Sequence, residues 1–217
     1  MASAPTVFEL TDQMFAEIGR AITAWSHVEQ TLFGVYQVCA GTSTKTHAGS
    51  VVHIDHDITS AVFYSLETLH VKRTILNAAV SAYVRGVPQE AELLLAWDKL
   101  SQKARELSRK RNKLAHWTVW EAQHIGKGTE DEPIRPARLL PPAGSPSFWR
   151  EFHPNPTGRY LTVGQVGHIY KAFQLYASKV RCFEKALIDT EELHDKDVRR
   201  ALDLLHHHQQ LSQMRRG

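Results

Sequence analysis

The segment that decides the fold is LLLAWDKLSQKARELSRKRNKLAH, from Leu93 to His116. Apolar residues recur in it at steps of three and four, which is the spacing of an amphipathic α-helix. The members of this apolar stripe are Leu93, Trp97, Leu100, Ala104, Leu107 and Leu114. Arg111 occupies a stripe position where the pattern predicts a buried apolar side chain. Because an unpaired buried charge is costly, we expect Arg111 to have a partner or a ligand.

Similar stripes predict further helices on both sides of this segment. A first helix is expected to run to about Ala40, with Thr11 or Asp12 as its N-cap, and a second to span Asp57 to Arg85. A fourth begins after Thr162, and a polar appended helix covers 195–217. The sequence therefore predicts an all-α protein, an up-down bundle of four to five helices.

An irregular insertion, 117–161, separates the third and fourth long helices. Most of the prolines lie in its 126–158 part, which is typical of a functional or irregular connection. Trp117–Ala122 is rich in aromatic and β-branched residues, so we predict a short strand there. Ala137–Leu140 and Arg159–Thr162 are its expected partners in a small β-hairpin or sheet. We expect residues 1–217 to form a single helical domain around this insertion.

Composition narrows the class of protein. The chain has 217 residues, a net charge of +3 and 42% hydrophobic residues, enough to bury a core. Seven basic residues lie between Lys99 and Lys113, opposed only by Glu106, which favours a nucleic-acid partner. Cys39 and Cys182 fall on apolar stripes and are expected to be buried free thiols. With no signal-peptide pattern and no apolar run of membrane length, we expect a cytoplasmic protein without a membrane partner.

The end of the deciding segment, RNKLAH at 111–116, resembles the signature of the HEPN superfamily. That signature is Arg, four to six residues and His, often with a polar residue directly after the Arg; Arg111, Asn112 and His116 match it. AWSHVEQTL, from Ala24 to Leu32, is similar to the first helix of several bacterial HEPN-like families. The resemblance implies a helical homodimer that acts as a metal-independent ribonuclease, as a toxin or in anti-phage defence. An antitoxin or defence-system partner is implied too. Thr118 stands where members silenced by a nucleotidyltransferase antitoxin carry tyrosine.

RNA cleavage without a metal needs residues of these types. A base takes the proton of the ribose 2′-OH, a cation stabilises the charge on phosphorus, and an acid protonates the leaving 5′-oxygen. His116 is suited to either proton transfer, and Arg111 to binding two phosphate oxygens. The products would be a 2′,3′-cyclic phosphate and a 5′-OH. We expect no cofactor and no metal in this reaction.

Helix geometry restricts how the motif residues cooperate. Arg111 and His116 lie roughly 140° apart around the helix axis, whereas Asn112 and His116 share a face. A composite site in a homodimer, with Arg111 of one chain facing His116 of the other, removes this difficulty. The alternative is structural, with Arg111 paired to a carboxylate and His116 capping the helix.

Four other residues belong to the predicted site. Glu29 lies on the apolar stripe of the first helix, so we expect it to pair with Arg111 and support it; direct catalysis by Glu29 is the alternative. Arg109, Lys110 and Lys113 flank the motif as RNA-backbone contacts or as an ordinary solvated helix face. Beside the endoribonuclease, two functions stay open: a non-catalytic nucleotide- or RNA-binding dimer, and a structural or regulatory helical protein.

Overall fold

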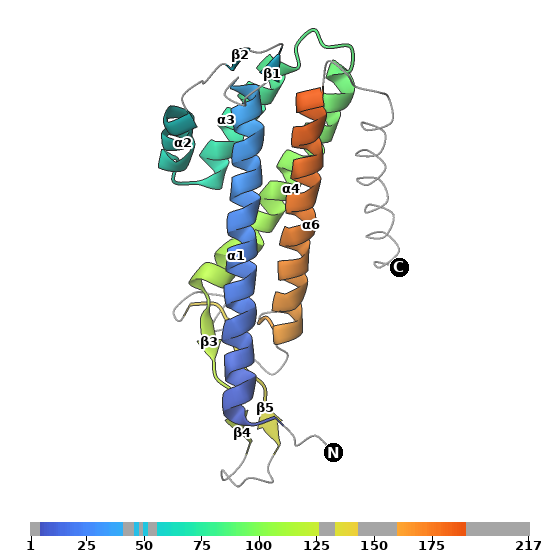
Figure 1. Cartoon of the computed structure of the whole chain (residues 1–217). Coiled ribbons are helices and arrows are strands. Elements are labelled where there is room, and N and C mark those ends of the chain that lie inside the picture. Colours follow the sequence, from blue (N-terminus) through green and yellow to red (C-terminus); the bar gives the residue numbers. More distant parts are fainter. Residues whose placement is uncertain are drawn as a thin grey trace, which may run out of the picture. The chain divides into compact units, whose positions relative to one another are not determined.

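The computed structural model describes residues 5–40, 46–47, 50–51, 56–125, 133–142 and 160–189. These ranges hold five α-helices: α1 (Val7–Cys39), α2 (His56–Ser65), α3 (Leu69–Tyr83), α4 (Glu90–His116) and α6 (Val163–Ile188) (Figure 1). Within the described residues, the strands are short and form antiparallel two-stranded pairs. The predicted all-α bundle with an irregular insertion is confirmed. The predicted helix at 195–217, like 126–132 and 143–159 of the insertion, lies outside the described residues.

The chain divides into two compact units, which are described separately. The first unit joins residues 1–26 to 109–174, and it contains the RNKLAH motif. The second joins residues 27–108 to 175–217. In the described part of the chain, no helix is long and apolar enough to cross a membrane.

In the first unit, α1 begins at Val7, four residues before Thr11, so the predicted N-cap at Thr11 or Asp12 is wrong. Thr6 caps the helix instead: Glu9 N–H donates to Thr6 Oγ1 (3.2 Å), and Thr6 N–H donates to Glu9 Oε2 (2.7 Å). This reciprocal pair is a capping box, which the sequence spacing of Thr6 and Glu9 allows. Thr11 is buried within the helix and accepts a hydrogen bond from Ala122 N–H at 3.1 Å.

The start of α6 follows the prediction. Thr162 and Gln165 form a second capping box, with Thr162 N–H donating to Gln165 Oε1 (2.9 Å) and Gln165 N–H donating to Thr162 Oγ1 (3.3 Å). The apolar face of α6 packs on that of α1, where Trp25 meets Phe173 edge to face at 5.1 Å between ring centroids. Both rings are buried, so this contact is part of the core of the first unit.

The insertion forms one interrupted hairpin beside the N-terminal half of α1 (Figure 1). Strand β3 (Thr118–Trp120) pairs with β6 (Arg138–Leu140), and β4 (Gln123–His124) pairs with β5 (Ile134–Arg135). The register is the same in both pairs, so Ala122 lies opposite Pro136 in the break. Pro136 has no N–H to donate. Ala122 instead directs its own N–H to Thr11 of α1, which attaches the hairpin to that helix.

A third chain segment joins this hairpin. Leu139 and Leu161 exchange two backbone hydrogen bonds of 2.9 Å, so Leu161 lies on the side of β6 away from β3. The predicted pairing of Ala137–Leu140 with Trp117–Ala122 is therefore confirmed. The predicted segment Arg159–Thr162 joins the sheet in another place, because its Leu161 pairs with Leu139 and not with Trp117–Ala122. We call these three segments the small sheet.

In the second unit, the predicted single helix from Asp57 to Arg85 is wrong, because it is two helices, α2 and α3. Thr68 breaks it: its backbone is extended, and its side chain accepts a hydrogen bond from Val71 N–H at 3.3 Å. This N-cap conformation ends any helix that enters from the other side. The break changes which side chains of α2 are buried, so that Val62 is 41% exposed and Phe63 is fully buried.

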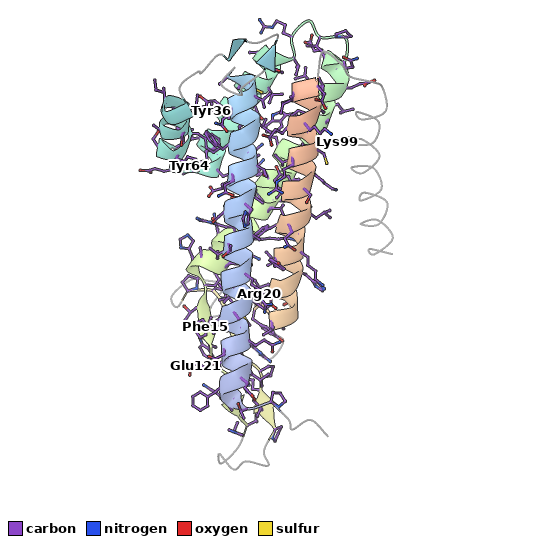
Figure 2. All side chains as sticks on the ribbon, in the orientation of Figure 1. Phe15, Arg20, Tyr36, Tyr64, Lys99 and Glu121 are labelled. Carbon is purple, nitrogen blue, oxygen red and sulfur yellow. The ribbon has the colours of Figure 1, made fainter. Side chains whose placement is uncertain are left out.

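Phe63 lies at the centre of an aromatic cluster. The ring centroid of Phe63 lies 5.4 Å from that of Phe33, 5.7 Å from that of Tyr36 and 5.4 Å from that of Tyr64. The Phe33 and Tyr64 centroids lie 5.2 Å apart. Figure 2 shows Tyr36 on α1 and Tyr64 on α2. Lys72 of α3 places its ammonium 5.2 Å from the Phe63 ring and 5.5 Å from the Tyr64 ring. A buried lysine is therefore part of this cluster.

Strands β1 (Thr46–His47) and β2 (Ser50–Val51) form an antiparallel pair that precedes α2 in the chain.

The two cysteines differ in their surroundings. Cys39 is partly buried, and burial raises its pKa to about 12. Cys182 is exposed on α6, so its predicted burial is wrong. Its neighbour Phe183 fills the core-facing position and stacks on Trp97 at 5.4 Å.

Candidate functional site

The three motif residues lie on the last turns of α4, in the first unit. Arg111 is half-buried, and Asn112 and His116 are exposed. Arg111 Nη1 donates a hydrogen bond to Asn112 Oδ1 at 3.3 Å. His116 is the last residue of the helix. The structure therefore brings Arg111 and Asn112 together.

His116 and Arg111 lie on different sides of α4. The buried residues Leu107 and Leu114 flank Arg111 on the core-facing side, whereas His116 is on the exposed side. This matches the angular separation of roughly 140° expected for five residues of α-helix. One chain alone thus presents the imidazole and the guanidinium in different directions.

The flanking basic residues are on the surface. Arg109, Lys110 and Lys113 are all exposed. Lys113 Nζ lies 4.9 Å from the ring centroid of Trp117, a cation–π contact that holds this ammonium near the end of the helix. Arg109, Lys113 and His116 project within roughly 60° of one another around the axis, so they share one face of the helix, to which Arg109 and Lys113 contribute positive charge.

The expected pair of Glu29 with Arg111 is wrong. Glu29 Oε1 lies 3.2 Å from Lys72 Nζ, in the second unit. Over the described ranges, Arg111 makes no ion pair with any carboxylate. The reason lies in the packing of α3: Lys72 is 43 residues from Glu29 along the chain, and only the tertiary structure places its ammonium beside that carboxylate.

Two cation–aromatic contacts near the motif were not expected. One is Lys113 on Trp117. In the other, the Arg138 guanidinium lies 4.1 Å from the ring centroid of Tyr160, within the small sheet. The spacing of Lys113 and Trp117, four residues apart where α4 ends, was a usable signal for the first contact, because Trp117 N–H still donates to the Lys113 carbonyl at 2.9 Å. Arg138 and Tyr160 are far apart in the sequence, and only the sheet register brings them together.

Comparison of the chain with protein-family models, with curated proteins and with solved structures gives no match. Among the residues that the structure describes, no group of three or more His, Cys, Asp or Glu side chains is placed to hold a metal ion. The candidate site is thus defined by its own residues: a half-buried arginine, an asparagine bonded to it, and an exposed histidine at a helix end.

Proposed function

We propose that this protein is a metal-independent endoribonuclease of the HEPN type, which acts as a toxin or defence effector and cleaves RNA with Arg111, Asn112 and His116. The observation that supports this most strongly is the state of Arg111. It lies on the core-facing side of α4 and is half-buried, yet within the described residues no carboxylate neutralises it. A guanidinium in this state is suited to bind a phosphate.

The proposed reaction assigns one task to each residue. A base removes the proton of the ribose 2′-OH, the 2′-oxygen attacks phosphorus, the bond from phosphorus to the 5′-oxygen breaks, and an acid returns a proton to that oxygen. His116 carries out one of the two proton transfers, since imidazole titrates near neutrality. Arg111 stabilises the charge on the non-bridging oxygens. Asn112 positions the Arg111 guanidinium through their hydrogen bond.

A homodimer completes this site in the proposal. Because Arg111 and His116 point to different sides of α4, Arg111 of one chain would act with His116 of the partner chain. Arg109, Lys110 and Lys113 would contact the RNA backbone, which makes binding depend on salt. An antitoxin or defence-system partner, and action in the cytoplasm, are parts of the same proposal.

The test is cleavage of a mixed RNA pool in EDTA, with the product ends mapped. We expect 2′,3′-cyclic phosphate ends from the wild type, and a loss of roughly 100- to 10,000-fold in rate for His116→Ala. His168→Ala is the matched control, because His168 is also an exposed histidine on a helix of the first unit. Arg111→Lys keeps the charge and loses the two-pronged phosphate contact, so it should lose most of the activity. Full activity in His116→Ala and Arg111→Lys would refute the proposal.

Mixing two inactive variants tests the composite site. In an equimolar mixture of Arg111→Ala and His116→Ala chains, half of the dimers carry one of each, and each such dimer keeps one intact site. We therefore expect about a quarter of the wild-type activity after exchange of subunits. No recovery, with exchange demonstrated by a mass-tagged chain, would contradict a site shared between chains.

The second candidate function is a dimer that binds RNA or a nucleotide without cleaving it. It is favoured by the same separation of Arg111 from His116, which leaves acid–base chemistry unassembled in one chain. This candidate predicts binding that weakens with salt, with intact RNA recovered. Cyclic-phosphate ends made by the wild type and lost in His116→Ala would reject it.

A further inference from the structure

A chain of hydrogen bonds joins α3 to α4 within the second unit. Arg73 Nε donates to Ser101 Oγ at 3.1 Å, and Ser101 Oγ donates to Asn77 Oδ1 at 3.0 Å. Trp97 Nε1 donates to the same Asn77 oxygen at 2.8 Å. Because Asn77 reaches Trp97 while the earlier Arg73 reaches the later Ser101, the two helices run antiparallel here. We call these four residues the polar seam.

The polar seam fixes a guanidinium without neutralising it. Arg73 is half-buried, and in the described part of the chain no carboxylate forms an ion pair with it. The acidic residue nearest to Ser101 along α4 is Asp98, and its Oδ2 accepts a hydrogen bond from Gln102. A partly buried charge without a counter-ion is costly. The position of Arg73 therefore predicts an anionic ligand.

The charge of Arg73 lies beside the core of this unit. Ser101 is 3% exposed, so the hydroxyl that accepts from Arg73 Nε is itself buried. Tyr176 of α6 is buried too, and its hydroxyl donates to the carbonyl of Leu100, the neighbour of Ser101, at 3.0 Å. Burial raises the pKa of Tyr176, and the charge of Arg73 acts in the opposite direction. The guanidinium is thus held by a buried anchor, close enough to a buried phenol to affect its ionisation.

The seam leaves a set of hydrogen-bond donors on one side of α3. Ser101 engages only Nε of Arg73, and within the described residues the two Nη groups have no acceptor. Trp97 can only donate, so the Asn77 atom that faces it is the oxygen, and the Asn77 Nδ2 amide remains a donor. Arg73 and Asn77 are four residues apart, so they share a side of the helix. A guanidinium fork beside an amide, with no carboxylate, suits the oxygens of a phosphate group.

A second positive charge lies beyond the Arg73 end of the seam. Arg105 follows Ser101 by one turn of α4, and the antiparallel register places it on that side of Arg73. Arg105 is exposed, and its neighbour Glu106 pairs with Lys103 at 2.6 Å. Positive charge of this kind raises the local concentration of anions around the seam.

We propose that the polar seam is a phosphate-binding site, in which the Arg73 Nη groups and the Asn77 amide hold a phosphate group while Ser101 and Trp97 keep them in position. The seam lies in the second unit, whereas Arg111, Asn112 and His116 lie in the first. The site therefore does not depend on the proposed ribonuclease activity. A mononucleotide and the RNA backbone present the same chemical group, and the experiment separates these two sources.

The test is an NMR titration of the full chain with inorganic phosphate, at an ionic strength held constant with chloride. Trp97 is the reporter, because its indole N–H donates to Asn77, and its signal is identified by its loss in Trp97→Phe. We expect this signal to shift in a saturable way while the indole signal of Trp25, in the other unit, stays in place. Arg73→Gln should weaken phosphate binding roughly 10- to 150-fold, the factor for losing a hydrogen bond to a charged group. Arg85→Gln removes an exposed arginine of the same unit and should leave the affinity nearly unchanged.

A second variant tests the anchor. Ser101→Ala keeps the guanidinium and removes the acceptor of its Nε, so it should weaken phosphate binding by roughly 2- to 10-fold. Far-UV circular dichroism and the Trp25 signal, unchanged in Arg73→Gln and Ser101→Ala, show that a loss of binding reports on the seam and not on the fold. The absence of a saturable Trp97 shift in the wild type, or equal affinities of the wild type and Arg73→Gln, would overturn the proposal.

Two further ligands identify the source of the phosphate. Adenosine 5′-monophosphate that shifts the Trp97 signal in the wild type, and binds more weakly to Arg73→Gln, assigns the site to a mononucleotide. A short unstructured RNA whose slope of affinity against salt falls by about one in Arg73→Gln assigns the site to the RNA backbone. Both results support a phosphate site. Nucleotide and RNA binding that are the same in the wild type and in Arg73→Gln would reject it.

Discussion

Replacing Glu29 by glutamine tests how the second unit tolerates a buried lysine. The Lys72 side chain is 7% exposed, and its ammonium has one carboxylate partner among the described residues, Glu29 at 3.2 Å. Glu29→Gln keeps the shape of the side chain and removes its charge. The ammonium then stays buried with a neutral amide as its neighbour, while the rings of Phe63 and Tyr64 still lie within cation–π distance.

The expected cost follows from these contacts. Removing one member of a buried ion pair costs about 3 to 5 kcal/mol. The Glu29 side chain is 28% exposed, so water already screens the pair and lowers this figure. The two aromatic rings continue to stabilise the ammonium by about 0.5 to 2 kcal/mol. We therefore expect Glu29→Gln to lower the free energy of unfolding by about 2 kcal/mol.

The opposite change should be milder. Lys72→Met puts an apolar side chain of similar length among aromatic rings and leaves a carboxylate that water can reach, so we expect a cost below about 1 kcal/mol. With Met at position 72, Glu29→Gln should cost almost nothing more. Urea unfolding of the four proteins gives this double-mutant cycle.

A matched control is the surface pair of Glu106 with Lys103, at 2.6 Å, in which the two side chains are 60% and 49% exposed. Glu106→Gln should cost less than about 0.5 kcal/mol. If Glu29→Gln costs no more than this control, the carboxylate does not compensate the buried ammonium and the reasoning is refuted. RNA cleavage by Glu29→Gln below its unfolding transition should match the wild type, because Glu29 is paired with Lys72 rather than with Arg111.

Three further predictions concern single contacts. Thr11→Val removes the acceptor for the Ala122 N–H and should cost about 1 to 3 kcal/mol in urea unfolding; Thr23→Val, at an exposed position, should cost far less, and equal costs would contradict the contact. A thiol reagent at neutral pH should modify Cys182 at once and Cys39 only after unfolding, because burial raises the Cys39 pKa to about 12; two fast thiols would refute this. Hydrogen bonds from the Thr6 backbone N–H, and secondarily from the Thr6 hydroxyl, lower the pKa of Glu9. The capping box therefore stabilises α1 fully at a pH above the ordinary glutamate pKa, and this stabilisation is lost as the pH falls through the lowered pKa. An NMR titration should show the Glu9 pKa rise in part in Thr6→Ala, and an unchanged pKa would contradict the box.

The parts of the fold that were predictable are those set by local sequence. The stripe of α4 and its end at His116 follow from helical periodicity, and the start of α6 follows from the Thr162–Gln165 capping box. The start of α1 was misplaced and the helix over 57–85 was left undivided for one shared reason: in both cases a local N-cap signal was missed. Thr6 and Thr68 are good N-cap residues, but an apolar stripe that continues past a cap conceals it.

The sequence by itself determined an all-α protein, a helix that ends in RNKLAH, and an arginine on the core-facing side of that helix, because each depends only on residues within a few turns. Tertiary structure alone decided the partner of Glu29, the continuous register of the hairpin around Pro136, and the contact of Arg138 with Tyr160. These features join residues separated by tens of positions. Which of several chemically acceptable partners a side chain meets then depends on how the elements pack, and no local pattern in the chain records that choice.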